Sequence, residues 1–311
     1  MRNYGYACIN MGFSTRPKSK RITTNRTMIK RTFLEKGIGY ASELALQNVQ
    51  DLCKILEWNL ENDIYFYRLS SDIIPWASEY EMEELPDYQE ILAACQKAGA
   101  FARKHNMRLT AHPGHFNKLA APKERVFQLT LADLKVHADL FDMIGLSRTP
   151  YAKLNIHVGA AYGDKPFALD NFCRNFERLP ENVQSRLTVE NDDKPSLYCT
   201  EELYEGVYKR IGTPIVFDYH HHMLHPGNQT EQEALEMALS TWPQSIIPVV
   251  HYAESRSAEY NNPKIKPQAH SDYVVREFND YGHCIDVMIE AKHKELALLR
   301  YREILNNRMI A

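Results

Sequence analysis

The sequence predicts a single-domain (β/α)8 barrel that spans residues 1–311. Three observations point to this α/β fold. Eight short β-rich runs alternate with eight longer amphipathic runs, most short runs are apolar and end in a polar residue, and composition does not change abruptly along the chain. Alternation predicts a parallel sheet, and continuously apolar strands indicate burial on both faces. Eight repeats favour closure into a barrel, and 311 residues suit one such unit.

The strands are expected where β-branched and aromatic residues gather in short runs. The first reads YGYACIN, the second IYFYRL and the fourth KLNIHV, and each ends at a polar or small residue where a connection begins. In order, the predicted strands are 4–10, 64–69, 108–112, 153–158, 186–190, 214–219, 246–252 and 284–289.

The helices are expected where apolar residues recur every three or four positions. Thr230 and Glu233 form the pattern of a capping box, and Pro75, Pro113, Pro226 and Pro267 fall in the connections, as helix breakers should. In order, the predicted helices are 42–62, 88–105, 124–146, 167–178, 196–210, 230–240, 271–281 and 292–305.

Composition excludes several classes of protein. Hydrophobic residues make up 44% and charged residues 25%, as in ordinary globular proteins. The six cysteines form no CxxC pair, so we expect free thiols in a reducing compartment. The amino-terminal residues lack the apolar run of a signal peptide, and no run is long enough to cross a membrane. We therefore expect a cytoplasmic protein that acts at the nucleoid, makes no membrane contact and works as a monomer. Without a G-x-G-x-x-G or Walker motif, no nucleotide cofactor is expected.

One segment is strongly basic although the net charge is −3. Between positions 16 and 31 the chain carries seven lysines and arginines and no acidic residue. Such a run is usually a solvated loop. It follows the first strand, however, so it would emerge on the catalytic face of a barrel. We therefore expect the basic segment to contact nucleic acid through Lys18, Lys20 and Arg21.

Imidazoles and carboxylates recur where the predicted strands end, which in such barrels is where catalytic groups lie. One of them, Glu79, lies in the connection after the second strand. The predicted metal ligands are Glu79, His112, His157, Glu190, Asp218, His221, His251, His270 and Glu290.

This ligand set contains oxygen and nitrogen donors and no thiolate. It suits Mn²⁺, Zn²⁺ or Fe²⁺, and its size favours two or three clustered divalent ions. A lone histidine is more often a structural residue, so the series as a whole carries the prediction. By contrast, His105, His137 and His293 fall on predicted helices and are expected at the surface. By strand alternation, His220 and His222 should face away from His221.

A set of metal ligands does not by itself determine which reaction an enzyme catalyses. A sugar isomerase, an abasic-site nuclease like endonuclease IV, and a lesion-binding protein that does not cut would each fit part of the pattern. The basic segment argues against a sugar isomerase, and several metals are not needed for binding alone.

The segments around these residues resemble the ultraviolet damage endonuclease family. The matching segments run in order along nearly the whole chain: GYACIN, YRLSSDIIPWAS, HPG at His112, NIHVG, LTVEND, FDYHHH, VHYAES, AHSDY and DVMIEAKHKE. The resemblance implies a metal-dependent nuclease, with manganese as the usual metal. It would incise damaged double-stranded DNA immediately 5′ of pyrimidine dimers, 6-4 photoproducts or abasic sites, leaving a 3′-hydroxyl and a 5′-phosphate.

The resemblance also suggests roles. Glu190, His251 and Lys292 are the expected catalytic residues, with Lys292 supporting the phosphate. Lesion contact is expected from Tyr6, Asn10, His115 and Phe116; for Tyr6, packing within the barrel is the competing interpretation.

Four positions depart from the family pattern. Glu79 stands where histidine is usual, His115 and Phe116 replace a Gln-Tyr pair, and Val249 replaces a lysine that some members modify. We therefore expect an intact hydrolytic centre, a different lesion-reading surface and no modified lysine at Val249.

Overall fold

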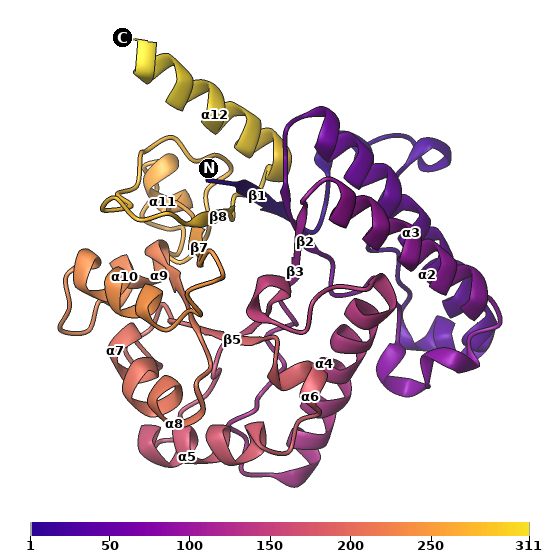
Figure 1. Ribbon diagram of the computed structural model, residues 1–311, viewed down its shortest axis with the longest axis horizontal. Helices are drawn as coiled ribbons and strands as arrows, with labels where there is room; N and C mark the ends of the chain where they lie inside the picture. Colours follow the sequence, from indigo (N-terminus) through magenta and orange to yellow (C-terminus); the bar gives the residue numbers. More distant parts are fainter. Residues whose placement is uncertain (1, 311) are drawn as a thin grey trace.

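The computed structural model describes residues 2–310, without the side chains of the last two of these. Its centre is a closed barrel in which each strand pairs in parallel with the next and β8 pairs with β1 (Figure 1). The strands are β1 (Tyr4–Ala7), β2 (Phe66–Leu69), β3 (Arg108–Ala111), β4 (Leu154–Ile156), β5 (Leu187–Glu190), β6 (Ile215–Asp218), β7 (Val249–Tyr252) and β8 (Asp286–Ile289). The predicted fold class and all eight predicted strands are confirmed.

Helices surround the barrel (Figure 1). The long ones are α2 (Lys30–Glu61), α3 (Tyr88–Lys104), α4 (Glu124–Ile144), α5 (Lys165–Phe176), α10 (Glu231–Ser240) and α12 (Lys294–Ile310). The predicted helix 196–210 is split into α7 (Thr200–Leu203), a π-helical turn (Tyr204–Tyr208) and α8 (Lys209–Ile211). Shorter pieces are α1 (Met11–Ser14), α6 (Glu181–Gln184), α9 (Tyr219–Leu224) and α11 (Arg256–Glu259). Within residues 2–310, none of the helices has the length and apolar character needed to span a membrane.

Two other helix predictions differ from the structure. The helix predicted at 42–62 begins earlier, at Lys30, with a kink at Gly37, whose φ is +68°. The helix predicted at 271–281 is wrong, because this segment is an irregular connection. Its amides donate to glutamates instead of to helical carbonyls: Asp272 and Tyr273 to Glu259, and Val275 and Arg276 to Glu254, at 2.7–3.0 Å.

Apolar side chains plug the middle of the barrel. Glu190, His251 and Glu290 from β5, β7 and the end of β8 contact one another, so they point inward. Because strand side chains alternate, the residues two positions earlier also point inward. In β6, β7 and β8 these inward residues are Val216, Val249 and Met288. They belong to one buried apolar cluster, which also contains Ala7, Phe66 and Trp242. Below it, buried Arg108 pairs with Asp286 at 3.0 Å and also donates to the carbonyls of Tyr151 and Ile247. An apolar layer thus lies between the two polar ends on the side of β6, β7 and β8, whereas beside β4 the buried side chain of Lys153 reaches His251.

Candidate metal centre

The carboxyl ends of the strands bring the predicted ligands to one end of the barrel. Glu190 and Asp218 are the last residues of β5 and β6, and His251 lies within β7. His112, His157 and Glu290 directly follow β3, β4 and β8. His221 is in α9, and His270 forms an isolated bridge with Ser255 in the connection after β7.

Glu190 lies at the centre of this cluster and contacts most of its histidines. Its carboxylate lies 3.2 Å from His112 Nε2, 3.8 Å from His157 Nε2, 3.3 Å from His221 Nδ1 and 3.1 Å from His251 Nδ1. Burial opposes its charge, but the surrounding imidazoles, first His251 and His157, outweigh burial and hold the pKa of Glu190 well below its usual range. A carboxylate therefore faces four imidazoles at neutral pH.

Glu290 forms the second acidic point of the cluster. One oxygen lies 3.1 Å from His251 Nδ1, the other lies 3.8 Å from His270 Nδ1, and Arg68 of β2 forms a short ion pair with the first. His251 is thus shared between the two carboxylates. The guanidinium and the imidazoles keep the pKa of Glu290 well below its usual range despite burial.

Neighbouring groups fix which ring nitrogens can bind a cation. His221 Nδ1 lies 2.9 Å from the carbonyl oxygen of Asn191, and His112 Nδ1 lies 3.3 Å from that of Pro113. Donation to these carbonyls leaves each Nε2 with its lone pair free, which is the usual arrangement of a metal-binding histidine. Asp218 is similarly oriented, since one oxygen caps α9 by accepting from the His221 amide at 2.8 Å.

The residues present fit divalent metal ions. Two sets place their ligand atoms within 4.8 Å of one another: His112, His157 and Glu190, and Glu190, Asp218 and His251. Among the described residues, Asp218 Oδ2 is buried without a hydrogen-bond partner. An unpaired buried polar atom is costly, and a bound cation would satisfy it. The donor set of oxygen and nitrogen matches the one predicted from the sequence.

Burial and charge divide the histidines into two classes. Burial lowers the pKa of His112 to about 4, so its ring is neutral at pH 7. Burial also opposes charge on His157 and His221, but nearby carboxylates outweigh it and raise the pKa of both. For Asp218 burial dominates and raises its pKa to about 6.

The sequence analysis missed several residues that support the ligands. Asn155 donates to Glu190, and Lys153 Nζ lies 3.2 Å from His251 Nε2. Both are fully buried, and burial lowers the pKa of Lys153 to about 7. They precede His157 by two and four residues, so strand alternation counted back from that ligand would have identified them.

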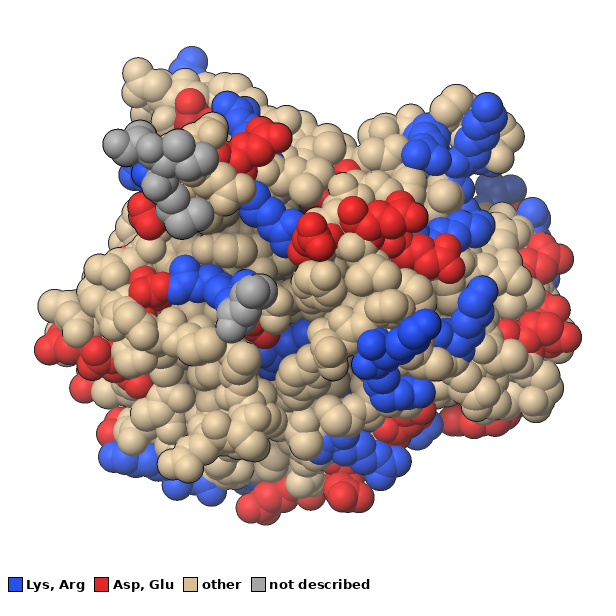
Figure 2. Space-filling model, turned by 45° about the horizontal axis from the view of Figure 1, so that its top comes forward, with Lys and Arg blue, Asp and Glu red and all other residues tan. Residues whose placement is uncertain are grey.

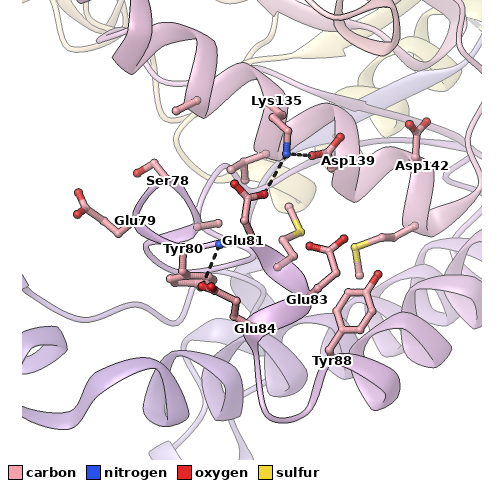
Figure 3. Close-up of a pocket in the computed structure, with 15 residues that line it drawn as sticks. Ser78, Glu79, Tyr80, Glu81, Glu83, Glu84, Tyr88, Lys135, Asp139 and Asp142 are labelled. Carbon is pink, nitrogen blue, oxygen red and sulfur yellow. Dashed lines mark hydrogen bonds and ion pairs between the residues drawn. The ribbon is translucent and has the colours of Figure 1, made fainter. Parts of the chain in front are cut away.

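Glu79 does not join the cluster. It is exposed in a 3-10 turn (Ala77–Glu79) at the edge of a cavity of about 600 Å³ against α4. Figure 3 shows its carboxylate directed away from the ion pairs that join Lys135 to Glu81 and Asp139. In this structure the Glu79 carboxylate is exposed to solvent, and its role as a metal ligand stays a prediction.

Tyr6 and Asn10 are structural residues, which corrects their predicted role in DNA contact. Tyr6 is fully buried, packs against the Tyr67 ring at 5.0 Å and donates to Asn59 of α2 at 2.8 Å. Asn10 is 1% exposed and caps α1 by accepting from the Phe13 amide at 3.0 Å. Neither side chain can reach a base, since both are enclosed by the chain itself.

Unlike Tyr6 and Asn10, His115 and Phe116 are exposed to solvent, in the connection after β3. Phe116 is 80% exposed, and the two rings lie 4.0 Å apart between centroids. The connection leaves His112, so these rings project from the same end of the barrel as the metal ligands. Because these two rings are exposed on the same connection as a metal ligand, they are available for contact with a partner at this end of the barrel.

The basic segment lies partly free and partly paired. Lys18, Lys20 and Arg21 are exposed, whereas Arg26 pairs with buried Asp51. In the view of Figure 2, basic and acidic side chains are interspersed, so a contact with a polyanion would depend on local groups. Lys292 is also exposed and follows β8 closely.

The remaining histidines only partly follow expectation. His105 and His293 are half-buried, and His137 is buried, with Nδ1 2.7 Å from the Asp133 carbonyl oxygen. The predicted surface position of His137 is wrong. His220 and His222 lie in helix α9 rather than on a strand, and His220 packs edge-on against His270 at 5.5 Å between centroids.

Comparisons with known proteins agree with this geometry. Residues 2–310 match the family model described as UV-endonuclease UvdE. The UV DNA damage endonuclease of Bacillus mycoides is 35% identical over 267 residues, which cover 83% of this chain and 80% of that protein. The crystal structure of SacUVDE superposes with a TM-score of 0.83 and 27% identity, and covers 99% of both chains.

A more distant structure shares the fold alone. Endonuclease IV from Thermus thermophilus has a TM-score of 0.55 and 12% identity, with 98% of this chain and 99% of that chain covered. The match over almost every described residue, together with the curated relative, shows that the chain belongs to the UV-endonuclease UvdE family.

Proposed function

We propose that this protein is a metal-dependent DNA repair endonuclease. It incises the backbone immediately 5′ of ultraviolet lesions, pyrimidine dimers and 6-4 photoproducts, and of abasic sites, and leaves a 3′-hydroxyl and a 5′-phosphate. The observation that carries this proposal is the cluster around Glu190 at the carboxyl end of a barrel whose whole length matches the UV-endonuclease family.

Two or three divalent ions would be bound at this centre, with Mn²⁺ as the first candidate and Zn²⁺ or Fe²⁺ as alternatives. The residues that would hold them are His112, His157, Glu190, Asp218, His221, His251, His270 and Glu290. Such ions activate water and neutralise charge on a phosphate and its leaving oxygen. Glu190 serves by bridging the two ligand sets, Arg68 holds Glu290 in place, and exposed Lys292 contacts the phosphate.

A nicking assay tests this function. Irradiated supercoiled DNA should be nicked in Mn²⁺ and left intact in EDTA, and sequencing of the ends should show a 3′-hydroxyl directly 5′ of the lesion. Equal nicking of unirradiated DNA, or nicking in EDTA, would contradict the proposal. Cutting at abasic sites alone would indicate an abasic-site nuclease.

Phe116 is proposed to test base stacking beside the lesion. Phe116→Ala should lower kcat/KM on a duplex with one photodimer about tenfold or more, because stacking on a base contributes about 1–3 kcal/mol. A photodimer stacks poorly, so opening the helix costs less there than elsewhere. The melting temperature should not change. Leu129→Ala, which truncates a residue that is 62% exposed on α4, is the matched control. An unchanged preference for damaged DNA in the Phe116 variant would exclude this role.

The basic segment is proposed to contact phosphates. Replacing Lys18, Lys20 and Arg21 by glutamine should reduce the slope of log K against log salt by up to about three, because each phosphate that is no longer neutralised lowers the slope by about one. Fluorescence anisotropy with a lesion duplex measures this slope. Neutralising Lys97, Lys104 and Lys209 changes the net charge equally on the outer helices and should leave the slope nearly unchanged. If both triple variants behaved alike, the segment would have no specific role.

Mn²⁺ binding should release protons at pH 7. In the metal-free protein, the pKa of His221 is raised well above its usual value and that of His157 is raised as well, so the folded protein holds protons on these rings that metal binding displaces, and affinity rises with pH. His112 is already neutral because its pKa is about 4. Calorimetry in buffers of different ionisation enthalpy should therefore show fewer protons released by His221→Asn, and an unchanged number by His112→Asn. Equal release by both variants would refute this division.

A further inference from the structure

A second group of metal-binding side chains lies outside the centre around Glu190. One ligand atom each from Cys199, Glu202 and His225 falls within 4.8 Å of the other two. We propose that these residues form a separate Zn²⁺ site, which joins the connection after β5 to the connection after β6. The proposal does not depend on the endonuclease function.

The first two ligands are held by the start of α7. Cys199 caps this helix and is 5% exposed, and Glu202 accepts from the Cys199 amide at 2.9 Å to complete a capping box. The other oxygen of Glu202 accepts from Lys165 Nζ at 2.7 Å. The carboxylate is thus fixed beside the sulfur before any ion binds, which lowers the entropic cost of binding.

His225 supplies the observation that the capping box leaves unexplained. The residue follows α9, is 8% exposed, and its Nδ1 is buried without a hydrogen-bond partner among the described residues. Leaving such an atom unpaired is unfavourable, because the atom has lost its hydrogen bonds to water. Coordination of a cation beside Cys199 and Glu202 would recover this cost.

The connection after α9 also encloses the sulfur. A Cβ atom added at Gly227 would lie 2.8 Å from Cys199 Sγ, and the φ of Gly227 is +62°. The backbone therefore passes directly over the thiol. This places His225 and the sulfur in one enclosed space built from two connections of the barrel.

The donor set selects the class of ion. Zinc bonds of about 2.0–2.3 Å in a tetrahedron place ligand atoms about 3.3–3.8 Å apart, so ligand atoms that lie within 4.8 Å of one another need to approach by about 1.5 Å at most. A thiolate, an imidazole and a carboxylate suit Zn²⁺, with water at the fourth position. The cluster around Glu190 has no thiolate among its ligands, which distinguishes the two sites chemically.

Cobalt substitution tests this site directly. The full chain is stripped with a chelator and titrated with Co²⁺, which gives a near-ultraviolet thiolate-to-cobalt charge-transfer band only when sulfur is a ligand. The wild-type protein should show the band, and Cys199→Ser should lose it. Cys173→Ser is the matched control, because Cys173 is also 5% exposed, and should retain the band. Absence of the band from the wild-type protein would overturn the proposal.

A second measurement guards against misfolding of Cys199→Ser. His225→Gln keeps the capping box, so it should fold, bind one Zn²⁺ fewer than the wild-type chain and show a smaller rise in melting temperature with Zn²⁺, because the centre around Glu190 still binds the ion. An unchanged zinc content would overturn the proposal. So would loss of the cobalt band in Cys8→Ser instead, since Cys8 lies on the connection after β1 and hydrogen-bonds to the Leu69 carbonyl at 3.6 Å. These measurements use no DNA, so their outcome is independent of the proposed endonuclease activity.

Discussion

Glu190→Gln should abolish incision, with a loss on the order of 10³-fold or more. The substitution keeps the volume of the side chain but removes the charge that faces four imidazoles at 3.1–3.8 Å. Both sets of ligands share this carboxylate, so its loss weakens both. The variant should also retain fewer Mn²⁺ ions per chain, measured by atomic emission after gel filtration.

A matched control separates chemistry from general damage. Glu205→Gln makes the same change at an exposed residue that pairs with Lys209 and should keep full activity and metal content. Full nicking of irradiated DNA by Glu190→Gln would refute the proposed centre, whatever its metal content.

Arg108→Leu should lower the free energy of unfolding by about 3–5 kcal/mol, because it leaves a buried carboxylate without its partner. The Asp286 side chain is 2% exposed and would keep only the Asn3 amide as a donor. The carbonyls of Tyr151 and Ile247 would lose a donor as well. Urea unfolding in EDTA measures the change without a contribution from bound metal.

Two further variants make this result interpretable. Arg148→Leu removes an arginine that is 52% exposed and pairs with Asp142, and should cost far less stability than Arg108→Leu because water screens the exposed pair. Adding Asp286→Leu to Arg108→Leu should recover part of the loss, because the unpaired charge is then gone. A double variant less stable than the single one would contradict this explanation.

The residues that end the strands were predictable because a barrel must place them together. Apolar runs ending in histidine or carboxylate located His112, His157, Glu190, Asp218 and His251 without any knowledge of contacts. The same argument does not apply to Glu79. It lies ten residues beyond Leu69, the last residue of β2, and strand geometry does not determine where so distant a side chain points.

Two of the wrong predictions have the same physical cause: contacts with residues distant in the sequence override what the local sequence pattern favours. Segment 271–281 has helical spacing, but the carboxylates of Glu254 and Glu259 take its amides. Tyr6 ends an apolar strand as a lesion wedge could, but Asn59 on the adjacent helix accepts from its hydroxyl and encloses it. Asn155 and Lys153 were missed for a different reason: only the residues that end the strands were considered, and the inward-facing positions were not followed back along the strand from His157.

The apolar layer inside the barrel has a consequence for protein engineering. Arg108 and Asp286 lie on one side of Phe66, Val249 and Met288, and the groups around Glu190 lie on the other. Buried Lys153 connects the two sets electrostatically, because it contacts His251 and its charge is opposed by Arg108 as well as by Arg68. A library that redesigns the floor of the barrel for thermostability should therefore keep the charge of Arg108, since its loss would change the protonation of a lysine that contacts a metal ligand.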